Sequence, residues 1–284
     1  MEWGRIINRI GKYKMELAIF LVIPLIAVIL SSLPADTRNG LKVNLLEFNV
    51  PTFYTATFVH EGFFTHFLPN ISWYYLLTFT SYFLSRISRR TKWFNINFLI
   101  FFLIFPMISY SSLILVNRLF LGGKLPPSCG MSGIVSAILG LTPISFLAFI
   151  RESGIRIRNE PLFAMLPFLT SALLIPYIYQ SLFLLLLLFP TVVVLVWYNR
   201  GNIVTVCRFL KKLSTQRFSH YLLAALSISL YFGGVVTIFP REIVVGGSSI
   251  IDIFTHYLGW ITGFFLSYLL LLVEKRLKRD VLGI

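Results

Sequence analysis

Charged residues are scarce in this chain of 284 residues. Asp, Glu, Lys and Arg make up 13% of it, and only 11 residues are acidic. Hydrophobic residues reach 57% and aromatic residues 16%, which is more apolar surface than one soluble core buries. The composition therefore excludes an ordinary soluble domain. Apolar runs of about 20 residues recur along the sequence, and each is long enough to cross about 30 Å of hydrocarbon as a helix.

Cysteines are also rare, and the sequence shows neither an internal repeat nor a signal-peptide cleavage site. The two cysteines, Cys129 and Cys207, fall in loops that the topology below assigns to opposite faces of a membrane, so no disulfide framework is expected. The sequence has no internal repeat, which argues against a transporter built from repeated halves. No small-residue cleavage site follows the first apolar stretch, and we expect that stretch to be retained.

The apolar runs predict an all-α polytopic membrane protein that forms a single domain over residues 1–284. At about 1.5 Å per residue, a single helix over residues 161–198 would be far longer than the bilayer is thick. We therefore interpret that run as a helical hairpin turning near residues 176–180. The chain then has about eight transmembrane helices, expected at residues 15–34, 64–85, 95–116, 131–150, 161–178, 181–198, 219–239 and 252–273.

The formal net charge of +14 indicates orientation in a membrane rather than a nucleic-acid partner. Of the 25 Lys and Arg residues, 20 fall on the side of the two termini. The positive-inside rule makes that side cytoplasmic, which predicts a multi-pass protein of the cell membrane with both termini in the cytoplasm. On the same side, residues 202–214 are basic and amphipathic, and we interpret them as an interfacial helix without chemistry. The apolar outer loop 35–62 is expected to lie partly in the opposite interface.

A polar loop runs directly into an apolar helix at Gly130-Met131-Ser132-Gly133. The two glycines leave space around the hydroxyl of Ser132. The first turn of the following helix directs unpaired N–H groups and its positive dipole end to the same place. This environment suits a nucleophile, although the tetrapeptide alone also fits a serine that caps the helix.

Polar residues within the spans are costly and indicate function by default. His66, Asn70 and His256 lie within predicted spans. Counting back from the inner charged end of each helix puts them within about one helical turn of the depth of Ser132. Four polar side chains on three helices at one depth predict a buried site, in which His256 takes the proton of Ser132 as a general base.

Small residues are expected to bring the serine helix and the last helix together. The last helix carries Gly259 and Gly263 at the G-x-x-x-G spacing. The serine helix carries Gly133, with Ala137 and Gly140 along one face. We expect Gly130, Gly133, Gly259 and Gly263 to allow close packing of helices at the site.

These residues resemble the motifs of the rhomboid intramembrane serine proteases, and the resemblance runs from the first helix to the last. The matching stretches are His66-Phe67-Leu68-Pro69-Asn70, Gly130-Met131-Ser132-Gly133 and His256-Tyr257-Leu258-Gly259 with Gly263. The resemblance implies a rhomboid-like helix bundle and a catalytic dyad of Ser132 and His256. It also implies that His66, Asn70 and the backbone N–H of Ser132 stabilise the oxyanion. Single-span membrane proteins would be the substrates, the lipid bilayer would surround the chain, and no metal or other cofactor would be needed.

Several features depart from that pattern and leave alternatives open. The hairpin at 161–198 is an insertion, and Ser136 stands where many members have a tyrosine. A catalytically weak or inactive rhomboid-like chaperone that binds transmembrane helices is therefore the alternative function. His60-Glu61 suggests a zinc protease, but His66 follows His60 by six residues and would face another side of a helix. Asp252 fits a helix N-cap better than a third catalytic residue.

Overall fold

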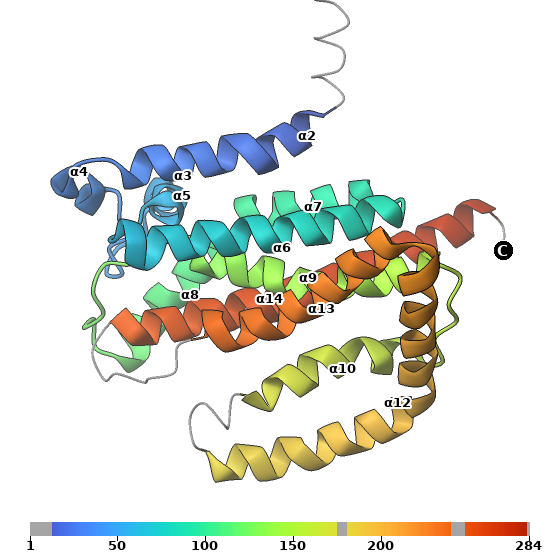
Figure 1. Cartoon of the computed structure of the whole chain (residues 1–284). Helices are drawn as coiled ribbons and strands as arrows, with labels where there is room; N and C mark the ends of the chain where they lie inside the picture. Colours follow the sequence, from blue (N-terminus) through green and yellow to red (C-terminus); the bar gives the residue numbers. More distant parts are fainter. Residues whose placement is uncertain (1–12, 175–180, 240–247, 283–284) are drawn as a thin grey trace, which may run out of the picture. The chain divides into compact units, whose positions relative to one another are not determined.

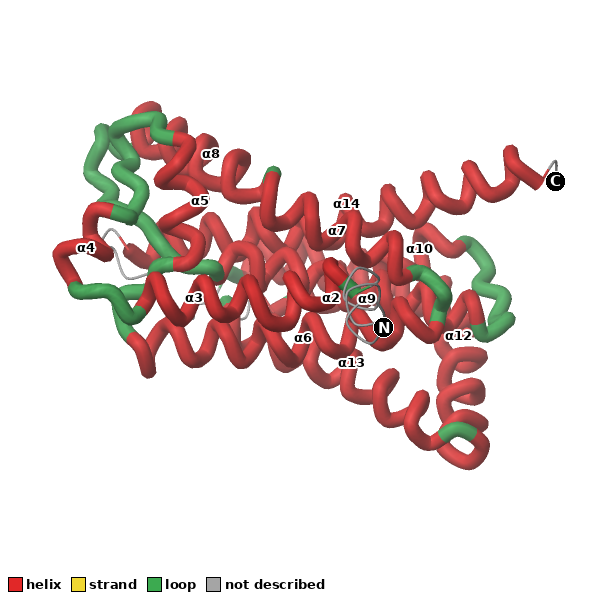
Figure 2. The backbone as a smooth tube through the Cα atoms, turned by 90° about the horizontal axis from the view of Figure 1, so that it is seen from above, coloured by secondary structure: helices red, strands yellow, loops and turns green. Residues whose placement is uncertain are grey.

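The structure is a computed structural model that describes residues 13–174, 181–239 and 248–282. These residues are helical or lie in loops, and no strand occurs among them (Figure 2). The elements are α2 Lys14–Leu17, η1 Ala18–Val22, α3 Ile23–Ser31, α4 Ala35–Gly40, α5 Val50–Phe58, η2 Phe63–Phe67, α6 Leu68–Ile87, α7 Thr91–Leu103, α8 Phe105–Phe120, α9 Ser132–Glu152, α10 Glu160–Ala172, α12 Leu182–Gln216, α13 Phe218–Ile238 and α14 Ser248–Leu282.

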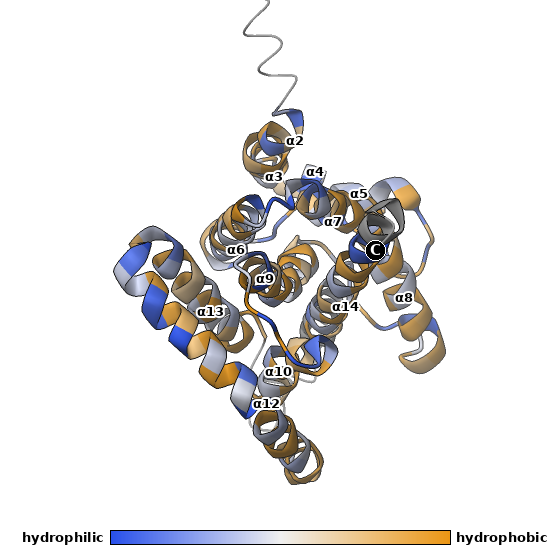
Figure 3. Cartoon of the chain, turned by 90° about the vertical axis from the view of Figure 1, so that its right-hand side faces the viewer, coloured by the Kyte–Doolittle hydropathy of each residue, from blue (hydrophilic) through white to orange (hydrophobic). Residues whose placement is uncertain are grey.

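The all-helical class predicted from the sequence is confirmed, and six helices in the described part are both long enough and apolar enough to cross a membrane. These six are Lys14–Ser31, Thr91–Phe120, Ser132–Glu152, Leu182–Gln216, Phe218–Ile238 and Ile253–Arg276. Many of their large apolar residues are exposed. Hydrophobic residues make up much of these helices (Figure 3), as expected for helices that face lipid. The chain is thus a helical, multi-pass membrane protein. Eight spans and cytoplasmic termini stay predictions.

The chain divides into two compact units, and each is described by itself. The first comprises Met1–Tyr75 and Phe102–Met131, and the second comprises Leu76–Phe101 and Ser132–Ile284. The single membrane domain expected over 1–284 stays a prediction.

In the first unit, the helix from Lys14 to Ser31 contains the π-helical turn η1. A π-turn breaks the regular i→i+4 ladder, so backbone carbonyls there become available to other donors. The hydroxyl of Tyr74 donates a hydrogen bond to the carbonyl of Ile19 (2.6 Å), and Tyr75 donates to Phe20 (3.1 Å). These bonds attach the start of α6 to the first helix.

The outer loop expected at 35–62 is largely folded. It contains α4 and α5 and is held by buried polar contacts to the segment that precedes α9. Val43 and Ser128 exchange two backbone hydrogen bonds (2.9 and 3.0 Å). The fully buried amide of Asn117 donates to the carbonyl of Leu45 (3.2 Å) and accepts from the N–H of Leu125 (3.0 Å). The loop is therefore a fixed part of the first unit.

In the second unit, α9 is the central helix, and 94% of the residues in its most apolar stretch of 18 are buried. It lies between α14 and α13 (Figure 3), and α10 also contacts it. Buried polar pairs join further helices. The hydroxyl of Ser267 in α14 donates to Asn97 in α7 (2.8 Å), and the indole of Trp93 donates to the carbonyl of Ser267 (3.2 Å). A helix buried on all sides explains why the sequence of α9 is apolar around its whole circumference.

The expected hairpin region forms two helices, α10 and α12. Residues 175–180, where the turn was predicted, lie outside the described residues. Asn202 in α12 holds the loop that leads into α10, because its side chain exchanges hydrogen bonds with the backbone of Arg158 (3.0 and 2.8 Å). Figure 1 shows that the first part of α12 runs beside α10, whereas its last part crosses the ends of α9 and α13. This last part contains the segment 202–214, which was expected to be a separate interfacial helix but continues α12 without a break, so Cys207 lies in a helix and not in a loop. Hydrophilic and hydrophobic residues alternate along it (Figure 3).

Candidate active site

Ser132 is the first residue of α9, as the sequence predicts for the junction of loop and helix. Its side chain is half-buried, and its hydroxyl has no hydrogen-bond partner within the described part of the chain. The first N–H groups of a helix lack partners in their own helix and carry the positive end of its dipole. Developing negative charge next to Ser132 would therefore be stabilised by the backbone of α9.

The role expected for Gly130 needs correction, because Gly130 lies in the loop before α9 and does not pack between helices. Its φ angle is +113°, a region that side chains rarely adopt, and a Cβ atom there would meet only the ring of His60 at ordinary contact distance (3.8 Å). Its N–H donates to the carbonyl of Ala56 (2.8 Å). Gly130 thus sets the path of the backbone two residues before Ser132.

Helices α9 and α14 approach each other at their glycines, as predicted. A Cβ atom built on Gly259 would lie 2.1 Å from the carbonyl oxygen of Gly133, and one on Gly263 would lie 2.0 Å from that of Ala137. A Cβ atom on Gly140 would lie 2.3 Å from the carbonyl oxygen of Trp260. The backbones are therefore in direct contact over two turns. Because residue numbers rise together along both helices, the two run in the same direction.

This register brings Ser132 and His256 to corresponding positions on the two helices. The Cβ atom of Ser136 lies 3.1 Å from the place where a Cβ atom of Gly259 would be, so these two positions face each other. Ser132 is four residues before Ser136, and His256 is three residues before Gly259. Positions three or four apart share a helix face, so each residue lies one turn beyond the contact.

The imidazole of His256 is buried, with 8% of its surface exposed, and packs edge-on against Phe239 (ring centroids 6.1 Å apart). The backbone carbonyl of Ile238 lies near the ring. Neither ring nitrogen makes a hydrogen bond with any described residue, Ser132 included. The hydroxyl of Ser136 is also buried without a partner. Buried polar atoms rarely stay unpaired, so the two imidazole nitrogens of His256 need an explanation, and a catalytic role would provide one.

His60 in the first unit is a residue whose role the sequence did not reveal. Its Nε2 atom accepts the N–H of Met131 (3.4 Å), which precedes Ser132 in the chain. The proton must then be on Nδ1, which donates to the hydroxyl of Ser31 (3.2 Å), and that hydroxyl donates to the carbonyl of Phe58 (3.1 Å). This chain of bonds holds the loop before α9. Because its members are distant in sequence, no local pattern could have indicated it.

The electrostatic state of His60 agrees with this network. Loss of hydration on burial lowers the pKa of the His60 imidazole to about 4, although a hydrogen bond to the backbone at Phe58 opposes the shift. The ring is therefore neutral at physiological pH, as a nitrogen that accepts the N–H of Met131 requires. Its neighbour Glu61 forms an ion pair with Lys42 (2.6 Å), which lowers the pKa of the Glu61 carboxyl.

His66 and Asn70 lie in the first unit, whereas Ser132 and His256 lie in the second. His66 is exposed at the end of the π-helical turn η2, and the amide of Asn70 donates to its backbone carbonyl (2.9 Å). One of the two amide N–H groups of Asn70 is thus used within its own helix. The expectation that His66 and Asn70 share a site with Ser132 stays a prediction.

Asp252 was interpreted from the sequence as the N-cap of the last helix. Asp252 lies inside α14, which begins at Ser248, so the interpretation of Asp252 as an N-cap is wrong. Within the described part of the chain, no group of three His, Cys, Asp or Glu side chains is arranged to hold a metal ion.

Comparison with models of protein families, with curated proteins and with solved structures gave no match. The likeness to rhomboid proteases thus consists of the sequence motifs given above.

Proposed function

We propose that the chain is an intramembrane serine endopeptidase of the rhomboid type, with Ser132 as nucleophile and His256 as general base. The observation that carries the proposal is the backbone contact between α9 and α14 at Gly133 and Gly259, which lie one residue after Ser132 and three residues after His256. Small residues in contact at this point fix the register of the two helices, and the register matches Ser132 with His256.

The chemistry follows from the properties of the two groups. The neutral imidazole of His256 takes the hydroxyl proton of Ser132 while the oxygen attacks a substrate carbonyl carbon. The imidazolium then returns the proton to the leaving amine, and water releases the acyl group in a second step. The unpaired state of both imidazole nitrogens is compatible with this role, since catalytic hydrogen bonds are often long or poorly aligned before a substrate binds.

The negative charge on the substrate oxygen needs donors. The N–H of Ser132 at the start of α9 is one, and we propose the side chains of His66 and Asn70 as the others. We propose single-span membrane proteins as substrates, cut near the outer face of the cell membrane, with both termini of the chain in the cytoplasm. A helical substrate must unwind before its carbonyl can react, so substrates should carry Gly, Pro or polar residues there.

One observation favours a second candidate function. Ser132 and His256 are not hydrogen-bonded to each other. A catalytically weak or inactive chaperone that binds transmembrane helices would need no such bond. The two candidates differ in one measurable respect, because only the protease forms new termini in its substrate.

The test is cleavage of a panel of single-span substrates by the purified chain in detergent. We expect Ser132→Ala and His256→Ala each to abolish cleavage, and the double variant to be no worse than either, because the two residues act as a unit. Ser136→Ala is the matched control, since it removes a buried hydroxyl one turn away on the same helix and should keep turnover. A fluorophosphonate probe should label wild type and Ser136→Ala but not Ser132→Ala.

The products locate the cut and separate the candidates. Mass spectrometry should find the new termini in the outer part of the substrate span. Binding of substrates without any product would favour the chaperone. Turnover retained in Ser132→Ala, or lost with a metal chelator, would show that another group does the chemistry.

A further inference from the structure

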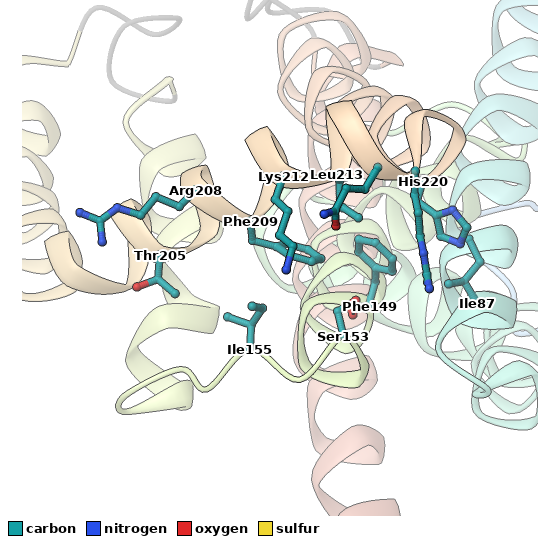
Figure 4. A pocket seen from close by; sticks show the side chains of 12 residues that line it. Ile87, Phe149, Ser153, Ile155, Thr205, Arg208, Phe209, Lys212, Leu213 and His220 are labelled. Atoms are coloured by element: carbon teal, nitrogen blue, oxygen red, sulfur yellow. Dashed lines mark hydrogen bonds between the residues drawn. The ribbon is translucent and has the colours of Figure 1, made fainter.

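A cavity of about 550 Å³ opens in the second unit where α9 ends and α13 begins (Figure 4). Its walls come from the end of α6, the end of α9 with the loop after it, the last part of α12 and the first turn of α13. The volume falls within the range of about 300–1,000 Å³ that is typical of small-ligand sites. The cavity is about one α9 length away from Ser132 and belongs to none of the chemistry proposed above.

The rim of the cavity is cationic. Arg208, Lys212 and Arg217 line it together with His220, and no acidic residue does. In the described part of the chain, none of these three permanent cations forms an ion pair. Figure 4 shows the Lys212 side chain extending over the space between Phe209 and Ser153, whereas Arg208 points away from that space.

The acidic residues nearby do not neutralise the rim. Glu160 pairs with Arg151 (3.6 Å) and Lys275 (3.8 Å), and Glu274 pairs with Arg90. Glu152 is exposed and does not line the cavity. The carboxylates at this end of the unit thus hold helices together, while the cations of the rim are left for an external anion.

The floor of the cavity is apolar. Ile87, Phe149, Ile155, Phe209 and Leu213 form it, and the rings of Phe149 and Phe209 are 5.9 Å apart. Phe149 and Leu213 belong to a buried hydrophobic cluster that continues into the unit. A ligand that fills the cavity must therefore present negative charge at one end and hydrocarbon at the other.

We propose that this cavity binds one anionic glycerophospholipid, with its phosphate between Lys212 and Arg217 and its glycerol and first acyl carbons on the apolar floor. The last part of α12 is amphipathic and crosses the helix ends, which is the position of a segment at the boundary of lipid and water. Basic pockets between helices at this boundary bind anionic headgroups. A free phosphate compound would leave the apolar floor exposed to water.

The experiment measures lipid binding to the full-length purified chain by native mass spectrometry in detergent. Dioleoyl phosphatidylglycerol is the probe, and dioleoyl phosphatidylcholine has the same acyl chains without the net charge. We expect Lys212→Gln to weaken phosphatidylglycerol binding about fivefold, the effect of one cation near a membrane surface. Lys211→Gln is the matched control, because Lys211 is the exposed neighbour that does not line the cavity. The affinity of Lys211→Gln for phosphatidylglycerol should stay within about twofold of that of wild type.

A second measurement locates the lipid. A phosphatidylglycerol analogue with a photoreactive group near the glycerol should label peptides from residues 149–155 and 205–217, and the label should fall in Lys212→Gln. Equal weakening by Lys211→Gln and Lys212→Gln would overturn the proposal, since it would reflect only the general positive charge of this face. Equal binding of phosphatidylcholine, or displacement by water-soluble glycerol phosphate at equal concentration, would also overturn it. Unchanged unfolding temperatures without added lipid establish that the variants are folded.

Discussion

Gly263 provides the sharpest test of the contact that positions Ser132 and His256. A Cβ atom on Gly263 would lie 2.0 Å from the carbonyl oxygen of Ala137 and 2.7 Å from its Cα atom. The obstacle is the backbone of α9, which cannot rotate away as the end of a side chain does. Gly263→Ala must therefore push α14 away from α9, by about 1 Å or more before the contact becomes ordinary.

The expected change in the free energy of unfolding of Gly263→Ala is the sum of two opposing effects. Alanine is better than glycine in a helix interior by about 0.5–1 kcal/mol. Overpacking a close contact costs about 1–3 kcal/mol, and a clash with backbone belongs in the upper part of that range. We expect a net loss of about 1–2 kcal/mol in the free energy of unfolding. A shift of about 1 Å at a reacting pair can also cost about 10²-fold in turnover, so cleavage should fall more than stability does.

The assay is reversible denaturation in detergent micelles, combined with turnover of one substrate. Gly201→Ala is the matched control, because nothing lies within 4 Å of a Cβ atom at that helical position. It should be neutral or stabilised by up to about 1 kcal/mol. The double variant Gly259→Ala/Gly263→Ala should lose less than the two single losses together, because the first methyl group already separates the helices. If Gly263→Ala were as stable and active as Gly201→Ala, the backbone contact would not exist in the folded protein.

Three further predictions concern buried polar groups. The folded-state pKa of His60 is about 4, below its ordinary value of 6.5, so the unfolded chain binds more protons between these pH values. The contribution of His60 to the free energy of unfolding is therefore complete above pH 6.5 and falls toward pH 4, by up to about 3 kcal/mol. His60→Gln should remove this pH dependence from unfolding curves recorded between pH 4 and 8. Ser267→Ala leaves the side-chain amide oxygen of Asn97 without its donor and should cost about 0.6–1.5 kcal/mol in denaturation, whereas no loss would mean that another donor replaces it. Asn117→Leu removes two buried bonds of the outer loop and should cost more, about 2 kcal/mol, in the same assay.

The helices and the α9–α14 contact could be predicted from the sequence because both depend on local patterns. Apolar runs identify helices that must satisfy their own backbone groups. The glycines at 259 and 263 match Gly133 and Ala137 because only small residues let two backbones touch. Ser132 at the first position of α9 follows from the change from polar loop to apolar helix.

Other features could not be predicted because they depend on residues that only the fold brings together. The bonds of His60 join Ser31 to Met131, which are 100 positions apart in the sequence. The positive φ angle of Gly130 accompanies a hydrogen bond to Ala56, which is distant in the sequence. The glycine itself is the only feature of the sequence that reflects this conformation. The basic segment 202–214 is the last part of α12, and the cavity beneath it could not be predicted because its walls also require the ends of α6, α9 and α13.

The two proposals can be tested independently because α9 separates their sites. Ser132 is its first residue, whereas Phe149 and Ser153 line the cavity at its other end. At about 1.5 Å per residue, the 21 residues of α9 span roughly 30 Å, so neither site can contact the other directly. Ser132→Ala should therefore bind phosphatidylglycerol as wild type does, and Lys212→Gln should keep full turnover in detergent without anionic lipid. Loss of turnover in Lys212→Gln under those conditions, with the unfolding temperature unchanged, would show that Lys212 acts on the chemistry itself and would overturn the separation of the two sites.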